Sequence, residues 1–230
     1  MIFGTIQEHQ VSALIPALNA GASLPRLLRQ LAASRCVRQI VVADGGSTDD
    51  TARSARAAGA SVIQTPRGRG TQLAAGARVA TAAWLLFLHA DCELVDGWET
   101  AVRRFMETRP GAAGYFDLRL DTTSAAARRL EKIVSWRCRA IALPYGDQGL
   151  LISRALYEEV GGFAAIPLME DVNLIRRLGR RRVAPLEHPI RASAARYERD
   201  GYVVRPLRNL FCLSLYFAGM APERIARLYD

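Results

Sequence analysis

Residues 84–91 have the sequence Trp84-Leu85-Leu86-Phe87-Leu88-His89-Ala90-Asp91, an unbroken apolar run that ends in a carboxylate. A short apolar run of this kind is typical of a strand buried on both faces. A second run, Ile40-Val41-Val42-Ala43, ends in the same way at Asp44-Gly45-Gly46. Because ligands of open α/β sheets bind outside the carboxyl ends of the strands, the two runs predict two carboxylates at one ligand-binding edge.

Strand and helix patterns alternate through the first part of the chain, beginning with a short apolar run that Pro16 is expected to end. Such alternation predicts an α/β fold with a central, mostly parallel sheet and helices on both faces. The strands are predicted at 11–15, 40–43, 62–63 and 84–88, and the helices between them at 24–31, 52–58 and 71–82.

The composition is that of a globular protein, with 230 residues of which half are apolar. This length and this apolar content suit one packed domain. The four cysteines have no CxxC spacing, which indicates neither a zinc site nor a disulfide framework. Residues 1–9 lack the basic start and apolar stretch of a secretory signal, so a cytoplasmic location is expected.

The formal net charge of +9 comes almost entirely from arginine, since Lys132 is the only lysine. Such a balance favours an anionic partner: nucleotide phosphates, nucleic acid or an acidic membrane surface. The arginines are scattered and lack the interleaved aromatic residues of a single-strand binder. We therefore do not expect nucleic acid as a partner.

Asp44 and Asp91 each follow one of the two buried runs. Asp44 can accept hydrogen bonds from a nucleotide base while Gly45 lets the backbone approach a ligand, although both residues also suit a tight turn. Asp91 is a candidate ligand of Mg²⁺ or Mn²⁺, which take one or two carboxylates and complete their shells with phosphate oxygens and water. Capping of the next turn is the alternative for Asp91.

Arg67 and Arg69 alternate with Gly68 and Gly70 ahead of the third predicted helix. Guanidinium groups and exposed backbone amides are suited to phosphates. The segment lacks the third glycine of a dinucleotide-binding loop and the GK[ST] of a nucleoside triphosphate loop. Neither of those two classes is therefore indicated.

Glu170-Asp171 opens a segment with helical spacing, after the turn-prone residues 161–167. A carboxylate at this position can act as a general base that removes the proton of an attacking hydroxyl. Two acids also interact favourably with any helix N-terminus, so a structural role stays open.

Together these motifs resemble the family 2 glycosyltransferases of the GT-A fold. The resemblance is closest to the small soluble branch labelled as selenodomain-associated transferases. It implies one domain over 1–230, with a nucleotide-binding half at about 10–92, an acceptor-binding half at about 93–205 and a C-terminal apolar helix at about 203–221. The motifs that carry it are Val11–Asn19, Asp44–Thr51, His89-Ala90-Asp91, Gly161-Gly162-Phe163 and Glu170-Asp171.

The resemblance also implies the chemistry. A hexosyl group would pass with inversion from a UDP- or GDP-linked sugar to an acceptor hydroxyl, with Mn²⁺ or Mg²⁺ as cofactor and Asp171 as the base. The implied donor-binding residues are Pro16, Asn19, Asp44, Gly45, Arg67, Gly70 and Ala90. The implied metal ligands are Asp91 and His188, and the implied acceptor-side residues are Asp147, Gln148, Glu170 and Arg196.

Two departures from the family pattern limit these implications. His89 occupies the first position of the usual Asp-x-Asp metal motif, which leaves Asp91 as the more secure ligand. For His188, a structural role and a ligand role both stay open. Polysaccharide synthases carry Gln-x-x-Arg-Trp where this chain has Ser193–Tyr197, so polymer synthesis is not expected.

Two alternatives to a glycosyltransferase stay open. They are a sugar-phosphate nucleotidyltransferase and a non-catalytic basic peripheral membrane protein that retains the fold.

The apolar stretch at 207–221 contains Arg208 and Asn209 and is too short for a membrane span. It can pack on the sheet as a C-terminal helix, or lie in an anionic membrane interface. The expected partners are therefore a nucleotide sugar and a lipid or small-molecule acceptor at the inner membrane surface, and a homodimer is left open.

Overall fold

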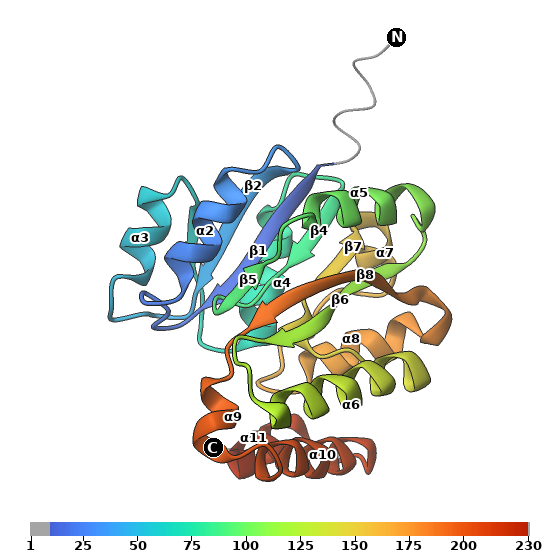
Figure 1. The fold of residues 1–230 in the computed structure, drawn as a ribbon. Helices are drawn as coiled ribbons and strands as arrows, with labels where there is room; N and C mark the ends of the chain where they lie inside the picture. Colours follow the sequence, from blue (N-terminus) through green and yellow to red (C-terminus); the bar gives the residue numbers. More distant parts are fainter. Residues whose placement is uncertain (1–9, 230) are drawn as a thin grey trace.

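The central sheet contains eight strands in the computed structural model, which describes residues 10–229 (Figure 1). Their order is β3-β2-β1-β4-β7-β6-β8-β5. Strands β1 to β4 are parallel, β6 and β8 are parallel to each other, and β5 and β7 run antiparallel to their neighbours. The strands are β1 (Val11–Ala17), β2 (Val37–Asp44), β3 (Ser61–Gln64), β4 (Trp84–Phe87), β5 (Cys92–Leu94), β6 (Ala113–Leu120), β7 (Leu150–Ser153) and β8 (Val183–Ala192).

The central strands supply side chains to two apolar cores, one on each face of the sheet. Leu85 and Phe87 of β4 belong to one core and Leu86 to the other, because successive side chains of a strand point to opposite faces. Every residue of β4 is buried, as the apolar run at 84–88 predicts.

Helices cover both faces of the sheet, which confirms the predicted α/β architecture. On one face lie α2 (Leu24–Ala32), α3 (Thr51–Ala57) and α5 (Trp98–Thr108). On the other lie α4 (Arg69–Val79), α6 (Ala125–Ile141), α7 (Arg154–Glu159) and α8 (Glu170–Leu178). The short α9 (Ala195–Asp200) leads to α10 (Val204–Phe217) and α11 (Pro222–Tyr229), which extend this second core below the sheet in Figure 1.

Strand β1 continues through Pro16, where the sequence predicts its end. β4 pairs with β1 only over residues 11–14, whereas β2 pairs with it as far as Ala17. At Pro16 the strand is therefore an edge strand on one side, where a missing N–H interrupts no ladder. The extension carries the chain to the carboxyl edge of the sheet.

The predicted C-terminal helix at 203–221 contains α10, which ends at Phe217, and a second helix, α11, follows from Pro222. Gly219 has a φ of +87° and follows the end of α10, and Pro222 begins α11. A left-handed glycine followed by a proline is a strong helix-stop signal, which the apolar composition of the stretch concealed. In the described part of the chain no helix is long and apolar enough to cross a membrane.

Candidate active site

Two adjoining pockets open at the carboxyl edge of the parallel strands. The larger, of about 410 Å³, is lined by residues 16–20 at the end of β1, 67–69 at the start of α4 and 89–91 after β4. The smaller, of about 130 Å³, is lined by the turn at 145–147, the start of α8, the end of β8 and parts of α9 and α10. The pockets share a wall that consists of Arg69, His89, Asp91 and Arg196.

The larger pocket is cationic. Arg67 lines it together with Arg69 and Arg196 of the shared wall, so three arginines line one space. Guanidinium groups bind phosphates through paired hydrogen bonds, and a diphosphate therefore suits this pocket. The predicted donor-binding residues that line it are Pro16, Asn19, Arg67 and Ala90.

Asp44 supports the larger pocket without lining it. The residue is 1% exposed, and its Oδ1 accepts hydrogen bonds from the N–H and hydroxyl of Ser47 at 3.0 and 2.6 Å. Burial alone would raise the pKa of Asp44, but hydrogen bonds from Ser47 and Gln64 outweigh it and hold the pKa below the usual range. Ser47 Oγ accepts the N–H of Asn19 at 2.9 Å. The carboxylate thus stabilises the loop that presents Asn19, and its predicted contact with a nucleotide base stays a prediction.

Gly45 and Gly70 make room for neighbouring protein groups and line neither pocket. A Cβ on Gly45 would lie 3.1 Å from Nε2 of Gln72, the amide that bonds the ends of β1 and β2. A Cβ on Gly70 would lie 2.2 Å from the carbonyl oxygen of Ala164. The loop at 164–166 therefore packs directly on α4 at Gly70, and Gln72 packs on Gly45. The predicted ligand contacts of both glycines stay predictions.

Arg69 pairs with both acids at the start of α8. Its Nε donates to Oε1 of Glu170, and its Nη2 lies 3.9 Å from Oδ2 of Asp171. Glu170 is 1% exposed and lines neither of these pockets, although it lines a third, smaller cavity together with Asp171. Its predicted acceptor-side role stays a prediction. Burial raises the pKa of Glu170, against the opposing charge of Arg69. Glu170 thus anchors Arg69 in the shared wall.

Asp171 lines the smaller pocket with both carboxylate oxygens held by backbone amides. Oδ2 accepts from the N–H of Gly146 at 2.8 Å, and Oδ1 accepts from the N–H of Val172 at 2.7 Å. Each oxygen keeps a further lone pair that a substrate hydroxyl can use. This is the geometry that a general base requires, since the group is fixed in direction and still able to accept a proton.

His89 and Asp91 contribute the part of the shared wall that follows β4. Nε2 of His89 lies 3.5 Å from Nη1 of Arg69, and because arginine can only donate, this nitrogen is the acceptor of a neutral ring. Burial, followed by the charges of Arg69 and Arg196, lowers the pKa of His89 to about 3. The Asp91 carboxylate forms no hydrogen bond or ion pair with any other described residue.

The shared wall suits a divalent cation that is coordinated mainly by phosphate oxygens of a bound molecule and by water. Over residues 10–229 there is no group of three or more His, Cys, Asp or Glu side chains placed to bind a metal. Mg²⁺ and Mn²⁺ can be bound by a single carboxylate when phosphate oxygens and water complete the shell. The unengaged carboxylate of Asp91, beside a pocket suited to a diphosphate, fits this arrangement.

Asp147 and Gln148 occupy the same turn but have different surroundings. Asp147 lines the smaller pocket, its Oδ1 is buried without a hydrogen-bond partner, and burial raises its pKa. Gln148 is 1% exposed, and its Nε2 donates to the carbonyl of Phe116 at 3.0 Å. Its amide fixes the turn to β6, and the predicted acceptor-side role of Gln148 stays a prediction.

His188 lies away from both pockets. Its Nε2 is 3.1 Å from the carbonyl oxygen of Val95, and its Cε1 would be 3.3 Å from a Cβ on Gly97. The pockets lie at the end of β8, whereas His188 precedes that end and follows Glu187, whose φ of +56° makes the strand irregular. Of the two roles that the sequence leaves open for His188, the structure shows a contact with the 95–97 loop, and the metal contact stays a prediction.

Sequence reasoning missed most of the wall of the smaller pocket. Arg205 and Asn209 of α10 line it, together with Tyr145 and Ser193. The side chain of Arg205 is 8% exposed and donates to Oδ2 of Asp200 at 2.7 Å. A charged residue inside an apolar helix was the available signal, since a buried arginine requires polar partners.

Comparison with known proteins assigns the class. Residues 12–159 match the family described as Glycosyl transferase family 2, and the chain therefore belongs to this family of glycosyltransferases. The PGL/p-HBAD biosynthesis glycosyltransferases of Mycobacterium tuberculosis and Mycobacterium bovis are 33% identical to it over 123 residues. The match covers 49% of this chain and 48% of the relatives, so the chain spans about half the length of the curated relatives it matches.

Solved structures show that the fold is GT-A. S. aureus TarS 1-349 in complex with UDP aligns with a TM-score of 0.63 and 16% identity, over 80% of this chain and 60% of that one. Glucosyl-3-phosphoglycerate synthase from Mycobacterium tuberculosis, in complex with Mn²⁺, UDP and glucosyl-3-phosphoglycerate, aligns with a TM-score of 0.54 and 19% identity. That alignment covers 84% of this chain and 75% of the synthase.

Proposed function

We propose that this glycosyltransferase moves a hexosyl group, with inversion, from a nucleotide-diphospho-sugar in the larger pocket to an acceptor hydroxyl in the smaller pocket. The observation that carries the proposal is the shared wall, where Asp91 lies between the cationic pocket and the pocket that contains Asp171. A donor anomeric carbon at this wall would lie between the leaving diphosphate and the attacking hydroxyl, as a single displacement requires.

The donor is assigned to the nucleotide-binding half, about 10–92, and the acceptor to about 93–205. Arg67, Arg69 and Arg196 supply the positive charge that a diphosphate needs. UDP as the nucleotide is supported by the UDP and UDP-GlcNAc complexes of the structurally similar TarS, with a GDP-linked donor as the alternative. The narrower relation to selenodomain-associated transferases, the cytoplasmic location and a homodimer stay predictions.

Asp91 would hold Mn²⁺ or Mg²⁺ together with the donor phosphates, which is supported by the Mn²⁺ in the glucosyl-3-phosphoglycerate synthase complex. When bound, the ion would neutralise negative charge on the leaving diphosphate. The neutral ring of His89 adds no positive charge there, so Arg69 and Arg196 supply the protein's cationic groups.

Asp171 removes the acceptor proton as the hydroxyl attacks. The Gly146 and Val172 amides fix the direction of its carboxylate, and Asp147 adds a second acid to the same pocket for contacts with acceptor hydroxyls. Membership of the glycosyltransferase family removes the nucleotidyltransferase and non-catalytic alternatives.

Release of a nucleoside diphosphate tests the proposal. The protein would be mixed with UDP-glucose, UDP-GlcNAc or GDP-mannose, with Mn²⁺ or with EDTA, and thermal shifts with UDP and GDP would be recorded in parallel. We expect either UDP or GDP to raise the melting temperature, and the corresponding nucleotide sugar to be hydrolysed slowly. Both the shift and the hydrolysis should be larger with Mn²⁺. In Asp91→Asn the Mn²⁺ enhancement should disappear, whereas Asp96→Asn, an exposed acid outside the pockets, should retain it. Absence of any nucleotide-dependent shift would contradict the proposal.

A further inference from the structure

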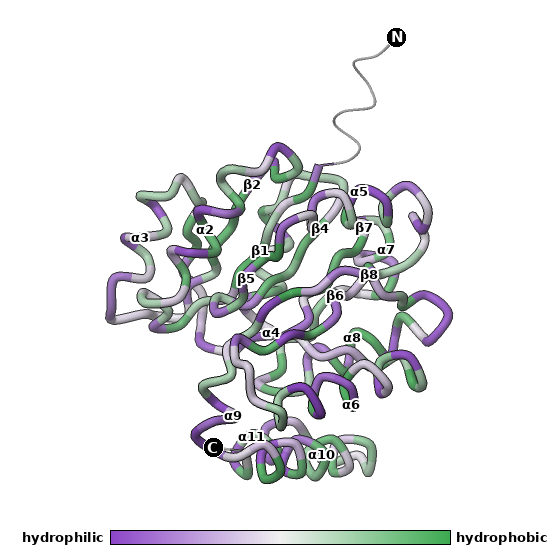
Figure 2. The backbone as a smooth tube through the Cα atoms, in the orientation of Figure 1, coloured by the Kyte–Doolittle hydropathy of each residue, from purple (hydrophilic) through white to green (hydrophobic). Residues whose placement is uncertain are grey.

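The outward face of α10 is apolar and exposed. Val204, Leu207, Leu210, Phe211 and Phe217 are each between 52% and 63% exposed. The inward face of the same helix is apolar as well, because Cys212 and Leu213 belong to the core. A surface helix normally turns a polar face to water, whereas α10 turns large apolar side chains to it. Figure 2 shows this apolar character along α10.

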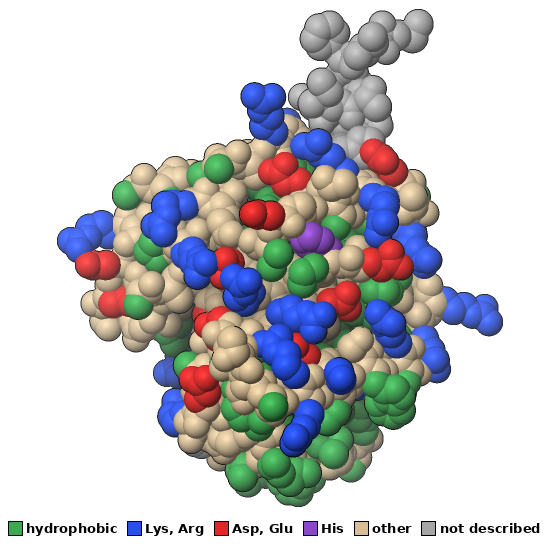
Figure 3. Space-filling model, viewed as in Figure 1, with side chains coloured by type: hydrophobic (Ala, Val, Ile, Leu, Met, Phe, Trp, Pro, Cys, Tyr) green, Lys and Arg blue, Asp and Glu red, His purple; other side chains and the backbone are tan. Residues whose placement is uncertain are grey.

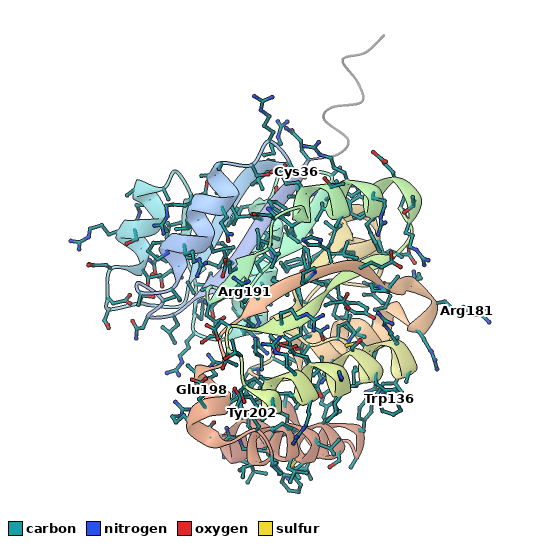
Figure 4. The ribbon with its side chains drawn as sticks, viewed as in Figure 1. Cys36, Trp136, Arg181, Arg191, Glu198 and Tyr202 are labelled. Carbon is teal, nitrogen blue, oxygen red and sulfur yellow. The ribbon has the colours of Figure 1, made fainter. Side chains whose placement is uncertain are left out.

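Helix α6 adds to this face at the same end of the molecule. Ile133, Trp136 and Ile141 are 62%, 69% and 53% exposed, and Figure 4 shows Trp136 on the side of α6 next to α10. The space-filling view shows the resulting apolar surface at the bottom of the molecule (Figure 3). We call the exposed apolar residues of α6 and α10 the apolar face. Contiguous apolar surface of this kind marks an interaction site, and tryptophan is typical of membrane interfaces.

Basic side chains accompany the apolar face. The exposed ones are Arg129, Lys132 and Arg139 on α6, and Arg224 and Arg227 on α11. Among the described residues of α6, α10 and α11 the acids are Glu131, which is buried, and Glu223. An apolar face with surrounding cations is complementary to an anionic lipid surface, which takes apolar groups below its charged headgroups.

The apolar face is joined to the smaller pocket by α10 itself. Arg205 and Asn209, on the other side of this helix, line that pocket. Nδ2 of Asn173, on the helix that Asp171 opens, donates to the hydroxyl of Tyr216 at 3.0 Å. A surface that binds α10 therefore lies one helix away from the pocket that we assign to the acceptor.

We propose that the apolar face docks on an anionic lipid bilayer and presents the smaller pocket to an acceptor hydroxyl carried by a membrane-held molecule. The second part rests on the proposed function, because it assigns the smaller pocket to the acceptor. The first part rests only on the exposure and charge of α6, α10 and α11.

Flotation with lipid vesicles tests the docking. The protein would be mixed with vesicles of phosphatidylglycerol and phosphatidylcholine, or of phosphatidylcholine alone, and the bound fraction measured after centrifugation. We expect at least about tenfold tighter binding to the anionic vesicles, and weaker binding when salt is raised from about 0.1 M to about 0.5 M. Failure of the wild-type protein to float with the anionic vesicles would overturn the proposal.

Two pairs of variants separate the apolar and the electrostatic parts. Leu207→Glu/Phe211→Glu should lose binding at least about tenfold, whereas Val79→Glu, an exposed apolar position at the other end of the sheet, should not. Arg224→Gln/Arg227→Gln should weaken binding to anionic vesicles, in contrast to Arg53→Gln/Arg56→Gln on α3. Equal losses in both members of a pair would overturn the assignment of the face.

The other occupant of such a face is a second copy of the chain. Analytical ultracentrifugation would reveal a dimer that Leu207→Glu/Phe211→Glu dissociates, and that result would also overturn the proposal. Nucleotide release from the soluble donor should be unchanged in this variant, because neither residue lines a pocket. Loss of vesicle binding with intact nucleotide release is thus distinguishable from failure of the proposed function, in which the wild-type protein floats but releases no nucleotide.

Discussion

The two pockets differ in how their walls are built. The larger pocket is lined chiefly by loops that directly follow β1 and β4 and precede α4. The smaller pocket combines a turn before β7, the start of α8, the end of β8 and side chains of α9 and α10. The first wall depends on the carboxyl edge of a parallel sheet, which α/β folds share, whereas the second depends on packing between segments far apart in the chain. We infer that the larger pocket is the generic half of the site and the smaller pocket the specific half.

The largest expected effect separates chemistry in the smaller pocket from binding in the larger one. In Asp171→Asn the side-chain oxygen can still accept the hydrogen bond from the Gly146 N–H, but the base is removed. Turnover should therefore fall by about 10²- to 10⁴-fold. Donor affinity, measured by UDP titration, should stay unchanged because Asp171 does not line the larger pocket. Asp96→Asn is the control and should retain both turnover and donor affinity. A parallel loss of donor affinity would show that the two pockets do not act separately.

The next effect concerns the loop between the pockets and uses two glycines of α4. Gly70→Ala would place a Cβ 2.2 Å from the carbonyl of Ala164, and should lower the free energy of unfolding by about 2–3 kcal/mol as an overpacked site does. Gly76→Ala is the matched control, since its Cβ would lie 3.6 Å from Leu14 Cδ2, an ordinary contact. Alanine should stabilise the helix there by up to about 1 kcal/mol. Urea denaturation measures the free energy of unfolding of both variants. Equal values for Gly70→Ala and Gly76→Ala would refute the packing role of Gly70.

Gly70 also illustrates what could be predicted from the sequence. The apolar runs before Asp44 and Asp91, with helical spacing between them, determine the parallel strands β1 to β4 and hence the edge where the larger pocket opens. Local pattern indicates that Gly70 is needed, but not whether the close neighbour is a ligand or, as here, the carbonyl of a loop about ninety residues later.

The sequence indicates only part of the wall of the smaller pocket, including Asp91, Asp147, Asp171 and Arg196. The rest of its wall could not be predicted because those residues acquire their roles from tertiary contacts. Glu170 and Asp171 are adjacent, yet the helix directs one to Arg69 and the other to the pocket. Strand β8 was missed because Pro185, Pro189 and a positive φ at Glu187 interrupt its pattern. The sequence therefore leaves the role of His188 open between a metal ligand and a structural residue, whereas the irregular strand brings its ring to the carbonyl of Val95.

A smaller effect is expected for the cations of the larger pocket. Arg67→Gln removes one of three guanidinium groups and should weaken UDP binding about tenfold, the loss of one charge-assisted hydrogen bond. Isothermal titration measures the affinity, and Arg56→Gln on the exposed side of α3 is the control. Turnover at saturating donor should change little. If turnover falls while affinity holds, Arg67 acts on the transition state and not on donor binding.

The smallest effect concerns pH and the wall of the smaller pocket. Asp200 accepts hydrogen bonds from Arg199, Arg205 and Arg208 at 2.7, 2.7 and 3.0 Å, and these, led by that of Arg199, hold the pKa of Asp200 well below its usual range. Because the folded pKa is below the unfolded one, this stabilisation is present above about pH 4 and is lost as the pH falls further.

Melting temperatures of the wild-type protein and Asp200→Asn, recorded from about pH 7 to about pH 3, should therefore converge towards acid. A constant difference would mean that the charge of Asp200 does not contribute. UDP affinity should be equal in the two proteins at neutral pH, since Asp200 stabilises Arg205 on the smaller pocket alone. A loss of UDP affinity in Asp200→Asn would instead show that the packing of α9 and α10 reaches the larger pocket through Arg196, and the division between a generic and a specific half would no longer hold.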